Sequence, residues 1–246
     1  MALVKEFETQ GNWLFKYRGQ LPVLLLVVQL IYDYYRRDHL LNNEINHQWM
    51  LICLGVSILG QLIRFAVIGY TPRNTSGRNT KQQVAEVVNQ TGIYSAVRHP
   101  LYLGNFFMWL GVAMISESLA FTFIFILIFW IFYERIMYAE EQFLTKTFGS
   151  AYTEWASRVP AFIPSFKNWK PSPNQFSLLN LLKRESVGIF NLFLVFYLFS
   201  LMASVKAGKG FDPSDPWLLV LGITTLVTLV LYVIRKKTRW LIVEGR

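Results

Sequence analysis

The sequence predicts an all-α fold: a polytopic integral membrane bundle of about six spanning helices, including a tight helical hairpin. Three observations predict it. Hydrophobic residues make up 53% of the 246 residues, and charged residues only 16%. The charged residues gather between long apolar runs, and a spanning helix needs about 20 consecutive, mainly apolar residues. Basic residues are also distributed unequally between the connecting segments, as in membrane proteins.

The apolar runs give four helices in the first part of the chain. Leu21–Tyr35 is a short first helix, and Trp49–Tyr70 is long enough for a full span. The next run is too long for one span, and the polar triplet Ser116-Glu117-Ser118 divides it into two arms, Leu101–Ile115 and Leu119–Tyr138. We therefore expect a tight helical hairpin at this triplet.

A second pair of helices is predicted near the end of the chain, at Val187–Val205 and Trp217–Ile234. The stretch Pro171–Asn174 is rich in residues that break helices and separates this pair from the rest. The sequence thus divides into an amphipathic N-terminus with the first helix at 1–48, a membrane core at 49–170, and a C-terminal helix pair with a basic tail at 171–246.

The Lys and Arg residues predict an orientation. If the amino terminus lies inside, nineteen of the 24 basic residues fall in inner segments, and short cytoplasmic loops hold an excess of Lys and Arg. We expect both termini and any pocket for a soluble cofactor at the cytoplasmic face. The net charge of +9 is interpreted as contacts with anionic membrane lipids, so no nucleic-acid partner is predicted.

The cysteine and histidine residues limit the chemistry. A single cysteine, Cys53, excludes an internal disulfide and any multi-cysteine metal site. The three histidines lack the spacing of a helical metal site, so no metal is predicted. The sequence carries no signal for the oligomeric state.

The segment from Arg98 to Gly104 places polar groups directly before a membrane helix. Pro100 suits the first helical position, and His99 then lies near the cap. The free amides of a first helical turn, together with Arg98, favour a carboxylate or phosphate. His99 and Tyr102 share a helix face, while Gly104 allows close approach of a ligand or another helix. The alternative is a belt of interfacial Arg, His and Tyr residues.

Two further groups of polar residues are candidates for a site. The acidic pair Glu140-Glu141, at the cytoplasmic end of the fourth helix, suits ribose hydroxyls or an ammonium group, or else is a solvated turn. The aromatic stretch 148–164 follows it and suits the membrane interface, where it can close over a cytoplasmic pocket. Arg64 lies within the second long run, so it faces the protein interior or extends to the interface.

These motifs occur together in a recognisable order. The segment Thr91-Gly92-Ile93-Tyr94-Ser95-Ala96-Val97-Arg98-His99-Pro100-Leu101-Tyr102-Leu103-Gly104 precedes a helical hairpin, and Glu140-Glu141, Phe148-Gly149 and Arg158-Val159-Pro160 follow it. The pattern resembles the isoprenylcysteine carboxyl methyltransferase family, which is related to the phospholipid methyltransferases, over roughly residues 49–170.

The resemblance implies a membrane enzyme that uses S-adenosylmethionine and methylates a lipophilic acceptor taken from the bilayer. The residues expected at the cofactor are Tyr94, Arg98, His99, Pro100, Tyr102, Leu103, Gly104, Glu140 and Glu141. Arg64 and Arg158 match family arginines and are expected to orient the acceptor. A carboxylate or thiolate acceptor needs no strong base, whereas an amine or hydroxyl needs one, for which Glu141 or His99 is the nearest candidate.

Two other functions are compatible with the sequence. The first is an NADPH-dependent membrane reductase of the sterol-reductase type, which resembles these methyltransferases in the same helical region. The second is a non-catalytic transporter or scaffold. Transporters often show two related halves with broken helices, and the sequence shows neither.

Overall fold

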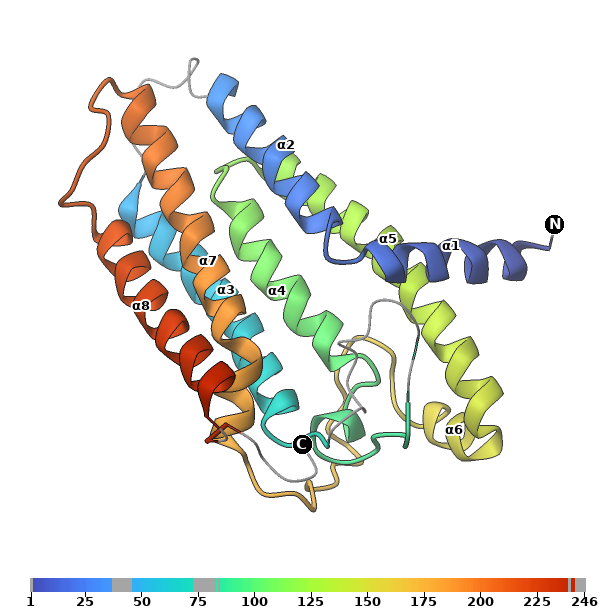
Figure 1. Cartoon of the computed structure of the whole chain (residues 1–246). Helices are drawn as coiled ribbons and strands as arrows, with labels where there is room; N and C mark the ends of the chain where they lie inside the picture. Colours follow the sequence, from blue (N-terminus) through green and yellow to red (C-terminus); the bar gives the residue numbers. More distant parts are fainter. Residues whose placement is uncertain (1, 37–45, 73–82, 84, 239, 242–246) are drawn as a thin grey trace.

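The computed structural model describes residues 2–36, 46–72, 83, 85–238 and 240–241, and all the regular secondary structure in these ranges is helical. Figure 1 shows a bundle of long, roughly antiparallel helices with one helix lying across it. The six predicted helices are all present: α2 (Leu21–Arg36), α3 (His47–Ile68), α4 (Pro100–Met114), α5 (Leu119–Phe148), α7 (Leu178–Lys206) and α8 (Pro216–Lys237).

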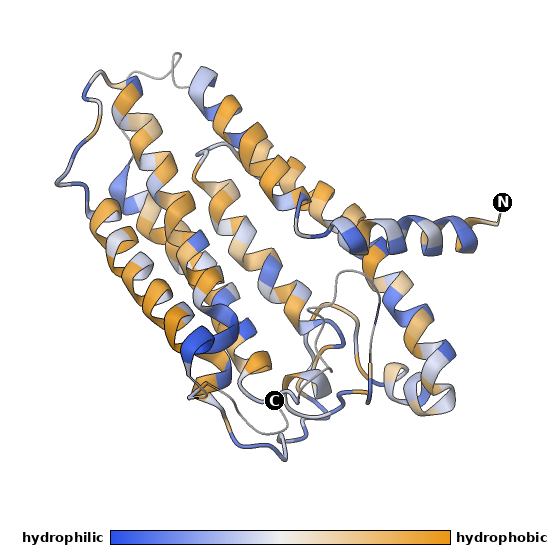
Figure 2. Cartoon of the chain, viewed as in Figure 1, coloured by the Kyte–Doolittle hydropathy of each residue, from blue (hydrophilic) through white to orange (hydrophobic). Residues whose placement is uncertain are grey.

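The helices have the lengths and composition of a polytopic membrane protein. Among the described residues, four helices, α3, α5, α7 and α8, are long and apolar enough to cross a membrane. The helix α1 (Leu3–Tyr17) and α2 form a fifth candidate that is bent by 74°, and α4 is a shorter apolar helix. Figure 2 shows hydrophobic residues along the shafts of the long helices and hydrophilic residues at their ends and along α1. The predicted fold class, a polytopic helical membrane protein, is confirmed, whereas the predicted count of about six spans is not.

Two helices extend beyond their predicted ends. The helix α5 continues past Tyr138 to Phe148, where Gly149 adopts a φ of 56°, which favours glycine, and turns the chain into α6 (Ser150–Ala156). The helix α7 begins at Leu178, where the Ser177 side chain accepts a hydrogen bond from the Asn180 N–H. Its first turns therefore carry residues that the sequence had placed outside a helix.

The hairpin between α4 and α5 turns at the predicted polar triplet. Helix α4 ends at Met114 and α5 begins at Leu119, with the Ser118 hydroxyl accepting from the N–H of Phe121 at 3.2 Å. Glu117 adopts a φ of 52°, the left-handed conformation that closes the turn. The start of α4 and the end of α5 consequently lie at the same end of the bundle, which we call the Pro100 end. Helices α3 and α8 also end there, and α7 begins there (Figure 1).

Glycines bring α3 and α4 into close contact. A Cβ atom at Gly60 would lie 2.3 Å from the carbonyl oxygen of Gly104, and one at Gly111 would lie 2.2 Å from Oγ of Ser57. Membrane helices commonly associate through such small residues because the backbones can then approach closely. The contact holds α4, including its first residue Pro100, against α3.

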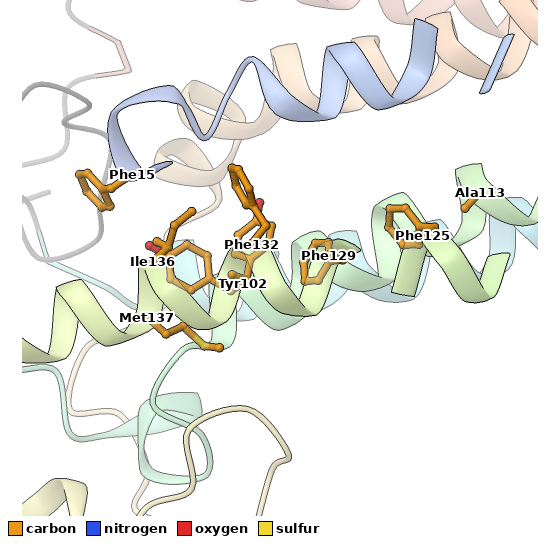
Figure 3. Close-up of a cluster of buried hydrophobic side chains, with 9 residues drawn as sticks. Phe15, Tyr102, Ala113, Phe125, Phe129, Phe132, Ile136 and Met137 are labelled. Carbon is orange, nitrogen blue, oxygen red and sulfur yellow. The ribbon is translucent and has the colours of Figure 1, made fainter. Parts of the chain in front are cut away.

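Two apolar clusters join the remaining helices to this pair. The first, drawn in Figure 3, combines Phe15 of α1 and Tyr102 of α4 with a row of α5 residues from Phe125 to Met137. The second joins α3 and α4 to the C-terminal pair through residues such as Phe196 and Trp217. The C-terminal helices therefore pack directly on the membrane core.

Helix α1 crosses α5 close to the acidic pair. A Cβ atom at Gly11 would lie 2.1 Å from the carbonyl oxygen of Arg135 and 2.7 Å from Cβ of Ala139, so the two helices touch at this point. The Arg135 guanidinium lies 4.6 Å from the ring centre of Phe7, and Glu8 pairs with Lys146. The N-terminal helix is thus anchored against the second half of α5 (Figure 1).

Candidate functional site

The start of α4 is held by the segment that follows α6. As predicted, Pro100 is the first residue of α4 and His99 is its N-cap. The backbone N–H of Arg98 donates to the Pro160 carbonyl at 2.9 Å, and that of His99 donates to the Ala161 carbonyl at 3.1 Å. The Arg98 side chain also donates to the carbonyls of two residues near the end of α6, Ala156 and Val159. These bonds bring two predicted motifs, far apart in the sequence, into contact.

The acidic pair of α5 meets the same segment. Arg98 Nε and His99 Nε2 both lie 2.9 Å from one oxygen, Oε1 of Glu141. Because an ionised carboxylate only accepts hydrogen bonds, His99 donates through this nitrogen. The Tyr102 hydroxyl donates to Oε2 of Glu140 at 2.9 Å. The structure thus assembles five of the predicted cofactor residues into one polar cluster, which we call the acid-pair cluster.

The acid-pair cluster has unused hydrogen-bonding capacity. The contacts that the described residues supply to Glu140 and Glu141 fall on one oxygen of each carboxylate. The two side chains are 29% and 25% exposed, whereas that of His99 is 5% exposed. The histidine is therefore a buried support, and the second oxygen of each carboxylate can accept from a bound molecule.

Aromatic side chains form a wall beside this cluster. Tyr152 and Trp155 of α6 are buried together, and Tyr94 of the short 3-10 helix η2 (Gly92–Ser95) packs against them. The Tyr152 hydroxyl and the Trp155 Nε1–H are buried, and neither has a hydrogen-bond partner among the described residues. The sequence had placed both residues only on an interfacial stretch, so their unsatisfied donors are a finding of the structure.

The two tyrosines of this wall stay protonated. Burial, and next the nearby Glu141 carboxylate, raise the pKa of Tyr152 well above its usual value. Burial, and next Glu140, raise the pKa of Tyr94 in the same way. The wall therefore offers neutral hydroxyl groups and aromatic faces next to two carboxylates.

Arg64 is paired inside the protein, which is one of its two predicted positions. Its Nε and Nη2 donate to the two oxygens of Glu185, at 2.9 and 2.7 Å. Its Nη1 donates to Asn105 at 2.6 Å, and Gln61 donates to Glu185 at 2.7 Å. The Glu185 side chain is only 3% exposed. Glu185 belongs to α7, outside the predicted membrane core, and was not predicted as a site residue.

A row of contacts connects Arg64 to the acid-pair cluster. Asn105, which accepts from Arg64, donates to the Tyr133 hydroxyl at 3.4 Å. The Tyr133 ring lies 5.1 Å from that of Tyr102, whose hydroxyl donates to Glu140. The predicted arginine and the predicted acidic pair therefore belong to one continuous set of contacts along α4 and α5.

Other predicted residues have different surroundings. Arg158 is exposed, and its Nε donates to the Glu154 carbonyl at 3.1 Å; no contact between it and Arg64 is found among the described residues. Pro100 and Leu103 are buried in the packing of α4. A Cβ at Gly104 would lie 2.7 Å from Cγ of Arg64, so this glycine faces α3.

The sequence that forms this site is similar to that of a known protein family. The family model described as phospholipid methyltransferase matches residues 48–151, which contain α3, α4 and α5. A protein-S-isoprenylcysteine O-methyltransferase of Schizosaccharomyces pombe is 34% identical over 113 residues, which are 45% of this chain and 48% of that protein. A protein of Oryza sativa subsp. indica named "Probable protein-S-isoprenylcysteine O-methyltransferase" is 30% identical over 137 residues, 52% of this chain and 68% of the relative. The chain belongs to the isoprenylcysteine carboxyl methyltransferase family.

The chain is also similar to proteins with other names. The cobalt-zinc-cadmium resistance protein CzcN of Cupriavidus metallidurans is 40% identical over 74 residues, 30% of this chain and 34% of that protein. The chain spans about half the length of the fission-yeast methyltransferase and about a third of the bacterial resistance protein. No solved structure matches the chain significantly.

Replacing Glu185 tests whether its ion pair with Arg64 holds α7 against the helices that the family model matches. In Glu185→Gln, the Arg64 guanidinium loses its carboxylate in a mainly buried place, so we expect the free energy of unfolding to fall by about 3 kcal/mol. The double variant Arg64→Met/Glu185→Leu should recover most of this loss, because it removes both charges. Unfolding in mixed micelles measures both effects.

The surface pair between Glu8 and Lys146 is the matched control for this prediction. Its lysine side chain is 65% exposed, so Glu8→Gln should cost less than about 1 kcal/mol. An equal loss of stability in Glu185→Gln and Glu8→Gln would show that the buried pair has no special structural role.

Proposed function

We propose that this protein is an integral membrane methyltransferase that uses S-adenosylmethionine and acts on a lipophilic acceptor. The observation that carries the proposal is the acid-pair cluster, in which Arg98, His99 and Tyr102 orient two carboxylates at the start of α4. These residues lie within the stretch matched by the phospholipid methyltransferase model. Relatives named as methyltransferases cover the same region.

The residues present fit S-adenosylmethionine. The buried Tyr152 and Trp155 donors have no hydrogen-bond partner among the described residues, and a nucleoside supplies acceptors for them. The second oxygens of Glu140 and Glu141 suit the ribose hydroxyls or the ammonium group. Arg98 and the first turn of α4 suit the methionine carboxylate. When bound, the cofactor supplies an electrophilic methyl group on a sulfonium, and aromatic faces such as that of Tyr94 favour a cation.

The other predicted cofactor residues act through the backbone. Pro100 provides the fixed φ with which α4 begins, and Leu103 is buried. Gly104 lets α4 approach Arg64. In this proposal, these three residues keep the start of α4 in place while the side chains of their neighbours contact the cofactor.

The chain's contribution to methyl transfer is alignment and the exclusion of water. Methyl transfer needs the nucleophile held in line with the methyl group in a dry pocket. Arg98 and His99 both donate to one oxygen of Glu141, and these bonds stabilise its side chain in the ionised form. This arrangement suits ligand binding better than proton abstraction. A carboxylate or thiolate acceptor fits this arrangement because it needs no base, whereas an amine would require Glu141 or His99 to take up its proton.

Two arginines orient the acceptor in this proposal. Arg64 uses three of its five N–H groups on Glu185 and Asn105. Two further N–H groups therefore face no partner among the described residues and can hold an acceptor oxygen. Arg158 is exposed at the Pro100 end, where it can reach the polar head of an acceptor. The hydrocarbon part of the acceptor enters from the bilayer.

We also propose that the Pro100 end faces the cytoplasm. The support is the bias of Lys and Arg toward the segments at this end. A soluble cofactor then reaches the acid-pair cluster directly, while the acceptor arrives from the lipid phase.

Transfer of a labelled methyl group tests the activity. Membranes containing the wild-type protein should move label from S-adenosylmethionine into the lipid-soluble or lipidated fraction. Glu141→Gln should lower the rate about tenfold to a hundredfold, because charged hydrogen bonds contribute about 1.5–3 kcal/mol. Glu134→Gln, on the same helix with a side chain that is 46% exposed, should leave the rate unchanged. Wild-type membranes that transfer no more label than membranes without the protein would contradict the proposal.

Removing single hydroxyl groups tests which donors contact the cofactor. Tyr152→Phe deletes a hydroxyl that has no partner among the described residues, so it should not lower the melting temperature of the free protein. It should weaken binding of S-adenosylhomocysteine about threefold to tenfold. Tyr102→Phe, by contrast, removes the bond to Glu140 and should lower the melting temperature. Loss of stability in Tyr152→Phe with unchanged affinity would contradict this assignment.

A further inference from the structure

A groove between α7 and α8 lies apart from the acid-pair cluster. It has a volume of about 280 Å³, and it is lined by residues from the first turns of α7 and the last turns of α8, at the Pro100 end. Its walls include Leu182 and Val187 from α7 and Leu229 from α8. The polar residues Lys183 and Arg235 also line it. An apolar slot with two basic residues therefore opens on the outer side of the helix pair.

The groove faces the surroundings of the bundle rather than its interior. Among the α8 residues only Trp217 is buried, and it lies at the opposite end of the helix. Leu229 and Tyr232, which line the groove, are 56% and 57% exposed. Because α8 is one of the helices apolar enough to cross a membrane, its exposed side lies against lipid.

The groove is basic toward the Pro100 end and apolar farther from it, which matches the charged head group and the acyl chains of a phospholipid. The Thr228 hydroxyl donates to the Ser186 carbonyl at 3.3 Å and joins the two helices. From this bond, Lys183 is about one helical turn nearer the Pro100 end, and Arg235 is about two turns nearer. The basic groups thus lie toward the membrane surface, and apolar walls continue below them.

The charge of the groove is not balanced by the helices that form it. Helix α8 contains no Asp or Glu, and the single acidic residue of α7 is Glu185, which is bonded to Arg64 and Gln61. No ion pair of Lys183 or Arg235 is found within the described part of the chain. Basic pockets between transmembrane helices suit anionic lipid head groups.

We propose that this groove is a binding site for an anionic phospholipid. Its phosphate lies between Lys183 and Arg235, and its acyl chains follow the walls formed by Val187 and Leu229, which lie farther from the Pro100 end. The site is distinct from the acceptor position, because Glu185, which pairs with Arg64, does not line the groove. A lipid bound there would tie α8 to the helix that carries Glu185.

Lipid retained by the full-length protein tests this proposal. Protein in a neutral detergent is incubated with equal amounts of phosphatidylglycerol and phosphatidylcholine, purified again, and its lipid is quantified by mass spectrometry. We expect phosphatidylglycerol to be retained at least about tenfold over phosphatidylcholine. The double variant Lys183→Gln/Arg235→Gln should bring this ratio close to one.

Two matched variants separate the groove from general surface charge. Lys170→Gln/Lys237→Gln removes the same charge from the Pro100 end at two residues that do not line the groove, and it should keep the ratio within about twofold. Val187→Trp fills the groove without changing its charge and should lower retention of phosphatidylglycerol. Equal retention of both lipids by the wild type, or equal losses in the two charge variants, would overturn the proposal. Displacement by soluble glycerol 3-phosphate at an equal concentration would also overturn it, because the site would then bind the anion without the lipid.

Discussion

The contact between Glu141 and the Arg98-His99 pair is the interaction on which the candidate site depends. Both donors reach one oxygen of the same carboxylate, at 2.9 Å each. The contact joins the two residues that directly precede α4 to a part of α5 that lies beyond the predicted span. It requires α5 to stay helical past Tyr138, and it requires the hairpin to return α5 to the end at which α4 begins. Arg98 also bonds the carbonyls near the end of α6, so the aromatic wall is placed by the same residue.

The second constraint is the burial of an arginine between membrane helices. A guanidinium in a low-dielectric interior requires a carboxylate with good geometry, and Glu185 provides both of its oxygens. This pair makes the C-terminal helices a structural part of the core, although the family model ends at residue 151. It also means that Arg64 presents hydrogen-bond donors with its charge already balanced. The acceptor that we propose at this position would therefore be held mainly by the direction of these donors.

Much of the fold follows from local sequence signals. The apolar runs located all six helices, Ser116-Glu117-Ser118 located the hairpin, and Pro100 marked the start of α4. The early start of α7 was missed because Lys183, Arg184 and Glu185 interrupt the apolar pattern there. A Leu-rich stretch from Leu178 and the Ser177 cap were the available signals.

The candidate site was predictable only where its residues fall into short motifs. Arg98, His99, Tyr102, Glu140 and Glu141 come from two such motifs, and the structure brings them together. Glu185 lies 121 positions from Arg64, and no periodic pattern connects residues that meet only through helix packing. The buried donors of Tyr152 and Trp155, which lack a partner among the described residues, were equally hidden, because they depend on burial rather than on sequence spacing.

Binding of S-adenosylhomocysteine to the purified full-length protein, followed by calorimetry, tests the central claim most directly. NADPH is titrated into the same preparation, because the competing reductase interpretation requires that cofactor. We expect saturable binding of S-adenosylhomocysteine and no binding of NADPH. Binding of NADPH alone, or of neither ligand by protein that unfolds cooperatively on heating, would contradict it.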